Sequence, residues 1–397
     1  MQLSVIILNY NVRYFLELCV LSVQNALLEI DGEIIVVDNN SEDDSCEMIR
    51  SRFPNVTLIS NGENLGFPKG NNIGVSYAKG EYICILNPDT VVAEDTFTKI
   101  LAFARSLNSL QSKKPIGIIG CKLIDGAGKF LPESKRGLPT PWVAFTKIMG
   151  LYKLIPKSSL FGKYYAEHLG ENETGEVDIL VGAFMLMKRD LYLEVGGFDE
   201  NCFMYSDDID LSYVVSRTGK SNYYFHETTV IHYKGESTIK DGTYMKRFQE
   251  AMNFFYKKHF GSNGFTSLLF SAFMRIGILL FSFFKMVRRQ NSFVTEPSSY
   301  LLYSSSEKWI DKLRSILQKK VSFYNLKTEK AVISSAGKST NNVEIILDNE
   351  FISFKDCIHF LESARNKGYT FKILPKNANF LIGSNNSNGR GEIIKIV

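Results

Sequence analysis

The sequence predicts an α/β protein built on a doubly wound sheet. Over the first 125 residues, short apolar runs alternate with helix-like stretches, and polar clusters follow several of the runs. Such alternation is typical of buried parallel strands covered by helices on both faces. The predicted strands are Ser4–Leu8, Glu33–Val37, Val56–Ile59, Tyr82–Leu86 and Ile116–Cys121. The predicted helices lie near Arg13–Leu27, Glu42–Arg52, Gly70–Lys79 and Glu94–Leu107.

The polar clusters come directly after the first, second and fourth predicted strands. They are Asn9-Tyr10-Asn11, Asp38-Asn39-Asn40-Ser41 and Asn87-Pro88-Asp89-Thr90. Any one of them is also typical of a turn or a helix cap. Doubly wound sheets bind ligands at the carboxyl ends of their strands, so three clusters on one edge indicate a binding site.

The remaining chain divides into an irregular stretch, further strands and helices, and a tail. Asp125–Glu176 is rich in Gly, Pro and aromatic residues and predicts a long loop or small insertion near the site. A strand at Glu176–Lys188 and a helix at Asp208–Thr218 follow. The predicted domain organisation is 1–262 for the first α/β domain, 263–340 for an apolar and basic helical segment with a linker, and 341–397 for a small α/β domain.

Charge and composition restrict the class of partner. Residues 240–330 hold 16 Lys and Arg against 6 Asp and Glu, which favours an anionic surface or simply a solvated basic face. The apolar run Phe265–Phe284 has Arg275 near its middle, so we consider an interfacial helix, a soluble packing helix and a true membrane span. No nucleic-acid recognition motif is present. The six cysteines form no C-x-x-C pair, and no signal peptide is visible, which predicts a cytoplasmic protein.

Several acids and one histidine suit the binding of a nucleobase, a divalent cation and a proton. Asp38, at a strand end, can accept the N3–H of a uracil or thymine ring, although it can also cap the next helix. Asp89 can bind a hard divalent cation, and the alternative is a turn residue. Asp207, Asp208 and Asp210 begin a helix whose dipole stabilises carboxylate anions. His232, after Thr229–Ile231, is a possible ligand of an Mn²⁺-like ion.

Seven motifs come in the order found in one enzyme family. Over roughly residues 1–260 the chain resembles the inverting family 2 glycosyltransferases with a GT-A fold, in particular their rhamnosyltransferase-like branch. The motifs are SVIILNYN (4–11), VVDNNSEDD (36–44), NLGFPKGNNIG (64–74), ILNPDT (85–90), GGFDE (196–200), FMYSDDIDL (203–211) and VIHYKGES (230–237). The tail at 371–392 is similar to the end of a Rossmann-like domain appended to some bacterial glycosyltransferases, which implies a small C-terminal half-domain.

The resemblance implies a role for each matching position. Asp38 would bind the nucleobase, Asp208 would be the general base, and Asp89 with His232 would hold Mn²⁺ or Mg²⁺. The other donor-binding positions would be Asn9, Asn71, Asn87, Gly182 and Ala183. Three departures from the family pattern stand out: Asn87 replaces the first acid of D-x-D, Asp207 replaces a glutamate, and Asn71 stands where many relatives carry an arginine. Lys69 is a possible substitute for that missing cation.

These features together predict an inverting transferase that uses dTDP-rhamnose or a UDP-sugar. Its acceptor is expected to be a glycan or lipid-linked molecule of cell-surface polysaccharide synthesis, met at the inner face of the plasma membrane through a peripheral contact. The alternative is a catalytically idle nucleotide-sugar-binding or scaffold protein, which would need Asp38 but not Asp89, Asp208 and His232 together. A nucleotidyltransferase is disfavoured because no glycine-rich loop follows the first strand.

Overall fold

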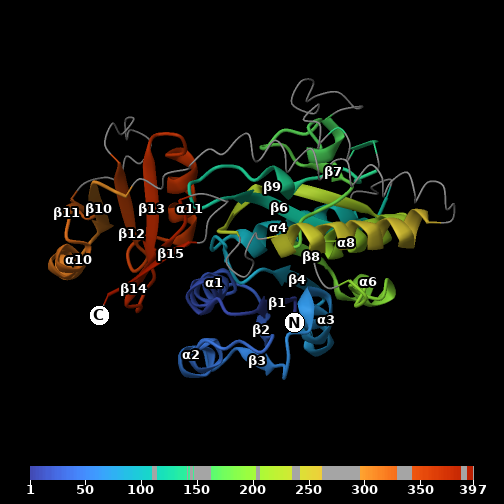
Figure 1. Ribbon diagram of the computed structural model, residues 1–397, viewed down its shortest axis with the longest axis horizontal. Helices are drawn as coiled ribbons and strands as arrows, with labels where there is room; N and C mark the ends of the chain where they lie inside the picture. Colours follow the sequence, from blue (N-terminus) through green and yellow to red (C-terminus); the bar gives the residue numbers. More distant parts are fainter. Residues whose placement is uncertain are drawn as a thin grey trace.

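A computed structural model shows two sheets with their helices side by side (Figure 1). The structure describes residues 1–109, 114–140, 142–143, 146, 162–202, 206–234, 242–261, 296–328, 342–385 and 391–396. The predicted segment Phe265–Phe284 lies outside these ranges. Within them, no helix combines the length and the apolar character that crossing a membrane requires.

The larger sheet is mixed and confirms the predicted doubly wound α/β class. Its strands run in the order β3-β2-β1-β4-β8-β6-β9-β5, and β7 pairs with β9. The pairs β1–β2, β1–β4, β2–β3 and β6–β9 are parallel, whereas β8 is antiparallel to β4 and β6. The strands are β1 (Leu3–Asn9), β2 (Gly32–Asp38), β3 (Thr57–Ser60), β4 (Tyr82–Leu86), β5 (Thr90–Val91), β6 (Ile116–Ile124), β7 (Gly175–Val177), β8 (Phe184–Lys188) and β9 (Ser221–His232).

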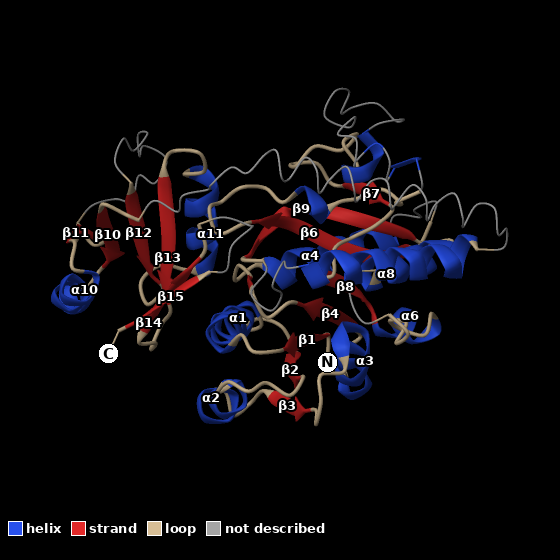
Figure 2. Cartoon of the chain, in the orientation of Figure 1, coloured by secondary structure: helices blue, strands red, loops and turns tan. Residues whose placement is uncertain are grey.

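Helices cover both faces of this sheet (Figure 2). Apolar residues of α1, α2 and α4 share one buried cluster with β1, β4 and β6, and residues of α3, α6 and α7 share another. Strands such as β1 and β4 are buried along their whole length because they are covered on both sides. The helices are α1 (Arg13–Ala26), α2 (Ser45–Arg52), α3 (Gly66–Tyr77), α4 (Thr96–Ser109), α6 (Arg189–Glu194), α7 (Asp207–Arg217) and α8 (Gly242–Phe260).

The prediction of a single strand at Glu176–Lys188 is wrong, because the two ends of this segment pair with different strands. The first part, β7, pairs with β9, and the second part, β8, pairs with β4 and β6. Residues 178–183 connect the two and bring Gly182 and Ala183 to the end of β4. The short strand expected at Thr229–Ile231 is the end of the longer β9.

The second sheet contains more of the chain than the predicted half-domain. Its order is β11-β10-β12-β13-β14-β15, with the first four strands parallel. Its elements are β10 (Ser299–Ser304), η4 (Glu307–Trp309), α10 (Ile310–Leu317), β11 (Lys320–Asn325), β12 (Val343–Asp348), α11 (Phe354–Ser363), β13 (Tyr369–Leu374), β14 (Phe380–Gly383) and β15 (Glu392–Lys395).

The expected linker is therefore wrong where the structure describes it, and the sheet starts at Ser299 rather than at 341. Tyr300 and Leu302 of β10 are buried in one apolar cluster, while the Ser304 hydroxyl donates to Asp348 Oδ2 at 2.6 Å. Ser304, which a local reading would place in a polar linker, ends a buried strand because Asp348 provides the hydrogen-bond acceptor that it needs.

The two sheets share one apolar cluster across α11, which lies between them (Figure 1). Phe15, Val91 and Tyr233 of the first domain pack in the same cluster as Phe354 and Phe371 of the second. Both Glu94 carboxylate oxygens accept backbone N–H groups at the start of α11, from Phe354 and Lys355, at 2.8 Å. The C-terminal domain is thus packed directly against the elements that follow the strand ends.

Candidate active site

The site begins at the paired ends of β1 and β2. Asn9 and Asp38 are register partners, and Asn9 Nδ2 donates to Asp38 Oδ1 at 2.7 Å. The Ser41 hydroxyl donates to the same oxygen at 2.7 Å, and the Ser41 backbone N–H donates to Asp38 Oδ2 at 2.9 Å. An ionised carboxylate has about four acceptor positions, so three internal hydrogen bonds fix Asp38 and leave room for one more.

Helix α3 starts beside these strand ends and carries Asn71. Asn71 is fully buried, and its Nδ2 donates to Phe67 O at 2.9 Å. A Cβ atom on Gly70 would lie 2.4 Å from Leu8 Cδ1, which is too close. The glycine therefore lets the helix approach β1 this closely. Asn71 is therefore held at the same rim as Asn9.

Asn87, Asp89 and His232 meet at the ends of β4 and β9. Thr90 of β5 is the register partner of His232, which places Asp89 next to the imidazole. Asp89 Oδ1 lies 3.3 Å from His232 Nε2, and Asn87 Nδ2 lies 3.4 Å from the same nitrogen. Below this corner, burial raises the pKa of the Cys19 thiol to about 12, and its S–H donates to Asn87 O at 3.5 Å.

Asp208 lies in the first turn of α7 and faces the 178–183 connection. Its Oδ2 accepts hydrogen bonds from Gly182 N at 3.1 Å and from the Arg136 guanidinium at 2.5 Å. Burial disfavours the charged guanidinium, but the neighbouring Asp208 carboxylate outweighs it and raises the pKa of Arg136. Both contacts use Oδ2, and within the described residues Asp208 Oδ1 is left as an acceptor.

Contacts connect the Asp208 end of the site to the Asp89 end. Asn87 N donates to Ala183 O at 3.0 Å, next to the Gly182 that contacts Asp208. Tyr233 N, directly after His232, donates to Asp89 O at 3.0 Å. The three residues that would carry the chemistry thus belong to one continuous edge of the sheet rather than to separate surfaces.

Four buried polar atoms along this edge accept no hydrogen bond from the described residues. They are Asn9 Oδ1, Asn71 Oδ1, Asp89 Oδ1 and His232 Nδ1. Buried polar groups in native proteins are nearly always satisfied, so unsatisfied ones need an explanation. A polar ligand or a cation along the rim provides one.

The Asp89–His232 pair fits a divalent cation that is shared with a ligand. Among the described residues, no group of three or more His, Cys, Asp or Glu side chains could hold a metal ion. A Mg²⁺-like ion does not need such a group when one or two protein ligands are completed by substrate phosphates. Asp89 Oδ1, which accepts no hydrogen bond from the described residues, and the adjacent imidazole would be ligands of this type.

Three residues near the site were not among the predicted ones. Arg136 contacts Asp208, and Glu133 forms an ion pair with Lys234. Despite burial, which opposes ionisation, Lys234 and the nearby His232 lower the pKa of Glu133. Arg136 and Glu133 come from the irregular 125–140 stretch, which the sequence places near the site without indicating any particular residue. Lys234 lies in the motif VIHYKGES, which does not by itself indicate a role for this lysine.

Known proteins resemble this chain in sequence. Residues 4–111 match the family model "Glycosyl transferase family 2". An N-acetylglucosaminyl-diphospho-decaprenol L-rhamnosyltransferase of Mycobacterium tuberculosis is 27% identical over 220 residues, 52% of this chain and 68% of that protein. The rhamnosyltransferase WbbL of Escherichia coli is 29% identical over 208 residues, 50% of this chain and 72% of that protein.

Solved structures also match, at lower similarity. A mannosyltransferase from Pyrobaculum calidifontis, in complex with GDP-Man and Mn²⁺, is 17% identical with a TM-score of 0.45, over 71% of this chain and 75% of that one. TarS 1–349 of S. aureus, in complex with UDP-GlcNAc, is 14% identical with a TM-score of 0.45, over 73% of this chain and 77% of that one.

The order of the sheet and the polar edge at its strand ends are typical of a domain with the GT-A fold. Residues 4–111 of that domain belong to glycosyl transferase family 2, and the rhamnosyltransferases above are relatives of this chain.

Proposed function

We propose that this chain is an inverting, metal-assisted glycosyltransferase of cell-surface polysaccharide synthesis. The observation that supports it best is the continuous edge from Asp38 through Asp89 and His232 to Asp208, with unsatisfied acceptors along it. The donor is a dTDP- or UDP-sugar, and dTDP-rhamnose is favoured because two relatives are named as rhamnosyltransferases.

The donor lies along this edge in the proposed complex. Asp38, which has acceptor capacity left, takes the N3–H of the base, and Asn9 and Asn71 contribute further acceptors. Gly182 and Ala183 leave space for the transferred sugar, since a side chain on Gly182 would approach Phe67 and Asp208. Asp89 and His232 would hold Mn²⁺ or Mg²⁺, which when bound offsets the charge of the leaving diphosphate.

Asp208 acts as the general base in a single displacement. Its Oδ1 receives the proton of the acceptor hydroxyl, whose oxygen forms a bond to the anomeric carbon. The bond between that carbon and the diphosphate oxygen breaks on the opposite face, so the configuration inverts and a nucleoside diphosphate leaves. Arg136 and Gly182 N hold Oδ2, which orients the carboxylate for this transfer.

The acceptor is a lipid-linked or glycan molecule. The M. tuberculosis relative is named for a diphospho-decaprenol-linked sugar, which supports a lipid-linked acceptor. Such an acceptor places the enzyme at the inner face of the plasma membrane, in peripheral contact with it.

Asp208→Asn tests the proposal. The variant keeps the shape of the side chain but loses a proton acceptor, so we expect turnover to fall by about 10²–10⁴-fold while donor affinity stays unchanged. Turnover is followed as nucleoside diphosphate release from dTDP-rhamnose and UDP-sugars, and affinity by calorimetry. Asp190→Asn, in the first turn of α6, is the matched control. Near-normal transfer by Asp208→Asn would refute the assignment of the base.

A further inference from the structure

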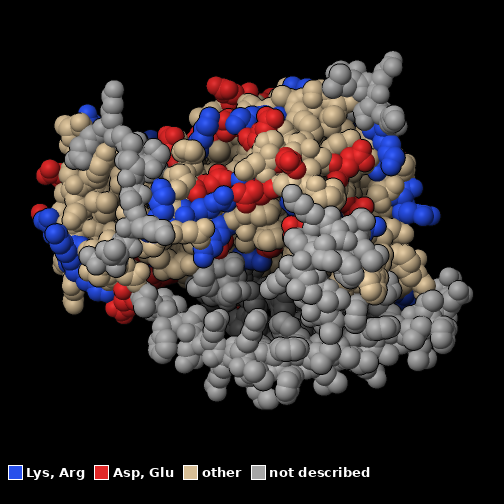
Figure 3. Space-filling model, turned by 90° about the horizontal axis from the view of Figure 1, so that it is seen from above, with Lys and Arg blue, Asp and Glu red and all other residues tan. Residues whose placement is uncertain are grey.

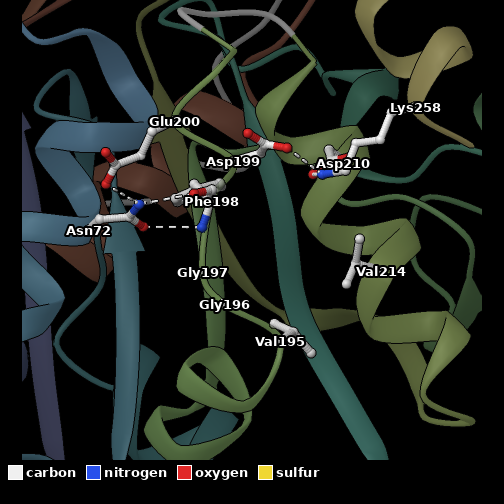
Figure 4. A pocket seen from close by; sticks show the side chains of 10 residues that line it. All are labelled: Asn72, Val195, Gly196, Gly197, Phe198, Asp199, Glu200, Asp210, Val214 and Lys258. Atoms are coloured by element: carbon white, nitrogen blue, oxygen red, sulfur yellow. Dashed lines mark hydrogen bonds and ion pairs between the residues drawn. The ribbon is translucent and has the colours of Figure 1, made fainter.

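A cavity lies beside Asp210 and Val214 of α7 (Figure 4). Its volume is about 320 Å³, the lower end of the range for small-molecule sites. Residues of α3, α7, α8 and the 195–200 loop line it. They are Asn72, Val195, Gly196, Gly197, Phe198, Asp199, Glu200, Asp210, Val214 and Lys258.

The cavity and the catalytic edge are built by the same elements. Successive helical residues are about 100° apart, so Asp208 and Asp210 point to nearly opposite sides of α7. Asp208 contacts Gly182, whereas Asp210 contacts Lys258 at 2.8 Å and His259 at 2.6 Å. The Phe198 ring packs against Phe67, with ring centroids 5.5 Å apart. Phe67 in turn lies next to Gly182. Asp208 and Asp210 are two residues apart, about 3 Å along the helix axis, so the cavity lies within the length of a short oligosaccharide from the proposed base.

The polar groups in the cavity are rigid but retain hydrogen-bonding capacity. Lys258 uses two of its three N–H donors, on Asp199 at 2.6 Å and on Asp210 at 2.8 Å. Glu200 accepts from Asn72 through Oε1 at 3.0 Å, and in the described part of the chain no donor binds its Oε2. Asn72 also donates to Phe198 O (Figure 4). The Tyr192 hydroxyl donates to Asn72 Oδ1, and these bonds anchor the loop.

The remaining lining suits the C–H faces of a sugar ring. Val195 and Val214 are apolar, and Gly196 presents bare backbone with open space where a side chain would stand. Three carboxylates against one ammonium make the cavity unfavourable for phosphate. A neutral ring with alternating hydroxyl and C–H surfaces matches this lining, and a diphosphate does not.

We infer that this cavity binds a sugar unit of the acceptor, next to the unit that carries the reacting hydroxyl. Lys258 donates to one of its hydroxyl oxygens, and Glu200 accepts from another. The inference rests on the proposed function, because only a glycosyltransferase would need an acceptor subsite here.

The test is binding of methyl glycosides of glucose, N-acetylglucosamine and rhamnose to the full chain, measured by saturation-transfer NMR without donor. We expect at least one glycoside to bind. Glu200→Ala, which removes the acceptor, and Val214→Trp, which fills the cavity from an incompletely buried position, should each weaken binding about tenfold. Glu194→Ala, an exposed position outside the cavity, should leave it unchanged.

Two results would overturn the subsite: no glycoside binding at all, or binding that survives both Glu200→Ala and Val214→Trp. Inorganic phosphate is the competing probe, and displacement of the glycoside by phosphate at equal concentration would also contradict the subsite.

Donor hydrolysis by the Glu200→Ala and Val214→Trp variants should equal that of the unmodified chain. If the unmodified chain hydrolyses no donor, the proposed function fails while the glycoside result is still obtained, so the two failures are distinguishable.

Discussion

At Asp89 and His232, two residues 143 positions apart in the sequence become neighbours because β5 and β9 pair. Neither residue indicates a metal site alone, since Asn-Pro-Asp-Thr is also a turn and a single histidine is often structural. Their 3.3 Å contact and their burial support the proposal that they hold a cation together. The backbone bond from Tyr233 N to Asp89 O fixes the spacing of the two strands at this point.

His232→Gln should raise the Mn²⁺ concentration needed for half-maximal activity about tenfold or more, because one of the two protein ligands is lost. Nucleotide affinity measured without metal should not change, since His232 would act through the cation. Electron paramagnetic resonance titration of Mn²⁺ in the presence of nucleoside diphosphate gives a direct readout. His226→Gln, on the same strand but bonded to Thr174, is the control. Equal effects of the two substitutions would argue against the site.

The 125–130 turn shows how one element connects the site to the second domain. Ile124 and Phe130 form an isolated bridge, so the chain reverses between them. Gly128 has a φ of +76°, and a side chain there would come within 1.9 Å of Leu361 O in α11. The turn can lie against α11 only because this position lacks a Cβ.

Gly128→Ala should lower the free energy of unfolding by about 2–4 kcal/mol, from left-handed strain together with a collision against backbone. Gly219→Ala is the matched control, because Gly219 has a φ of +83° and open space around its Cβ position. It should cost about 1 kcal/mol from strain alone. Urea denaturation of both variants measures the difference. Equal decreases in the free energy of unfolding would show that the close contact with α11 does not add to the cost of the substitution.

On the scale of the whole molecule, the C-terminal domain is joined to the first by apolar and charged contacts. The shared cluster includes Val91 and Tyr233, which flank the proposed metal ligands. Ion pairs also cross the boundary, from Lys355 to Asp95 at 2.7 Å and from Arg365 to Glu171 at 2.8 Å. Figure 3 shows charges of both signs interspersed over the described part of one face. The second domain is thus a structural support for the Asp89–His232 corner.

A double-mutant cycle on Asp95→Asn and Lys355→Met should give a coupling of about 0.5–1 kcal/mol at neutral pH. Partial burial opposes ionisation of Asp95, but hydrogen bonds from Lys355 and Lys99 outweigh it and lower the pKa below the ordinary value of 3.8. The stabilisation is therefore complete above pH 3.8 and disappears as the pH falls through the folded-state pKa. Thermal unfolding between pH 2.5 and pH 7 measures the coupling, and a coupling that grew in acid would contradict this sign.

The sequence alone determined the first α/β domain and the order of its motifs, because buried strands and helix starts are local patterns of apolar and capping residues. It also indicated Asp38, Asp89, Asp208 and His232 through their motifs. Only the tertiary structure decided which of their atoms meet, that Arg136 holds Asp208, and that Ser299–Ser304 is a strand. Those outcomes depend on partners far away in the chain, such as Asp348 for Ser304, and no local pattern of residues contains them.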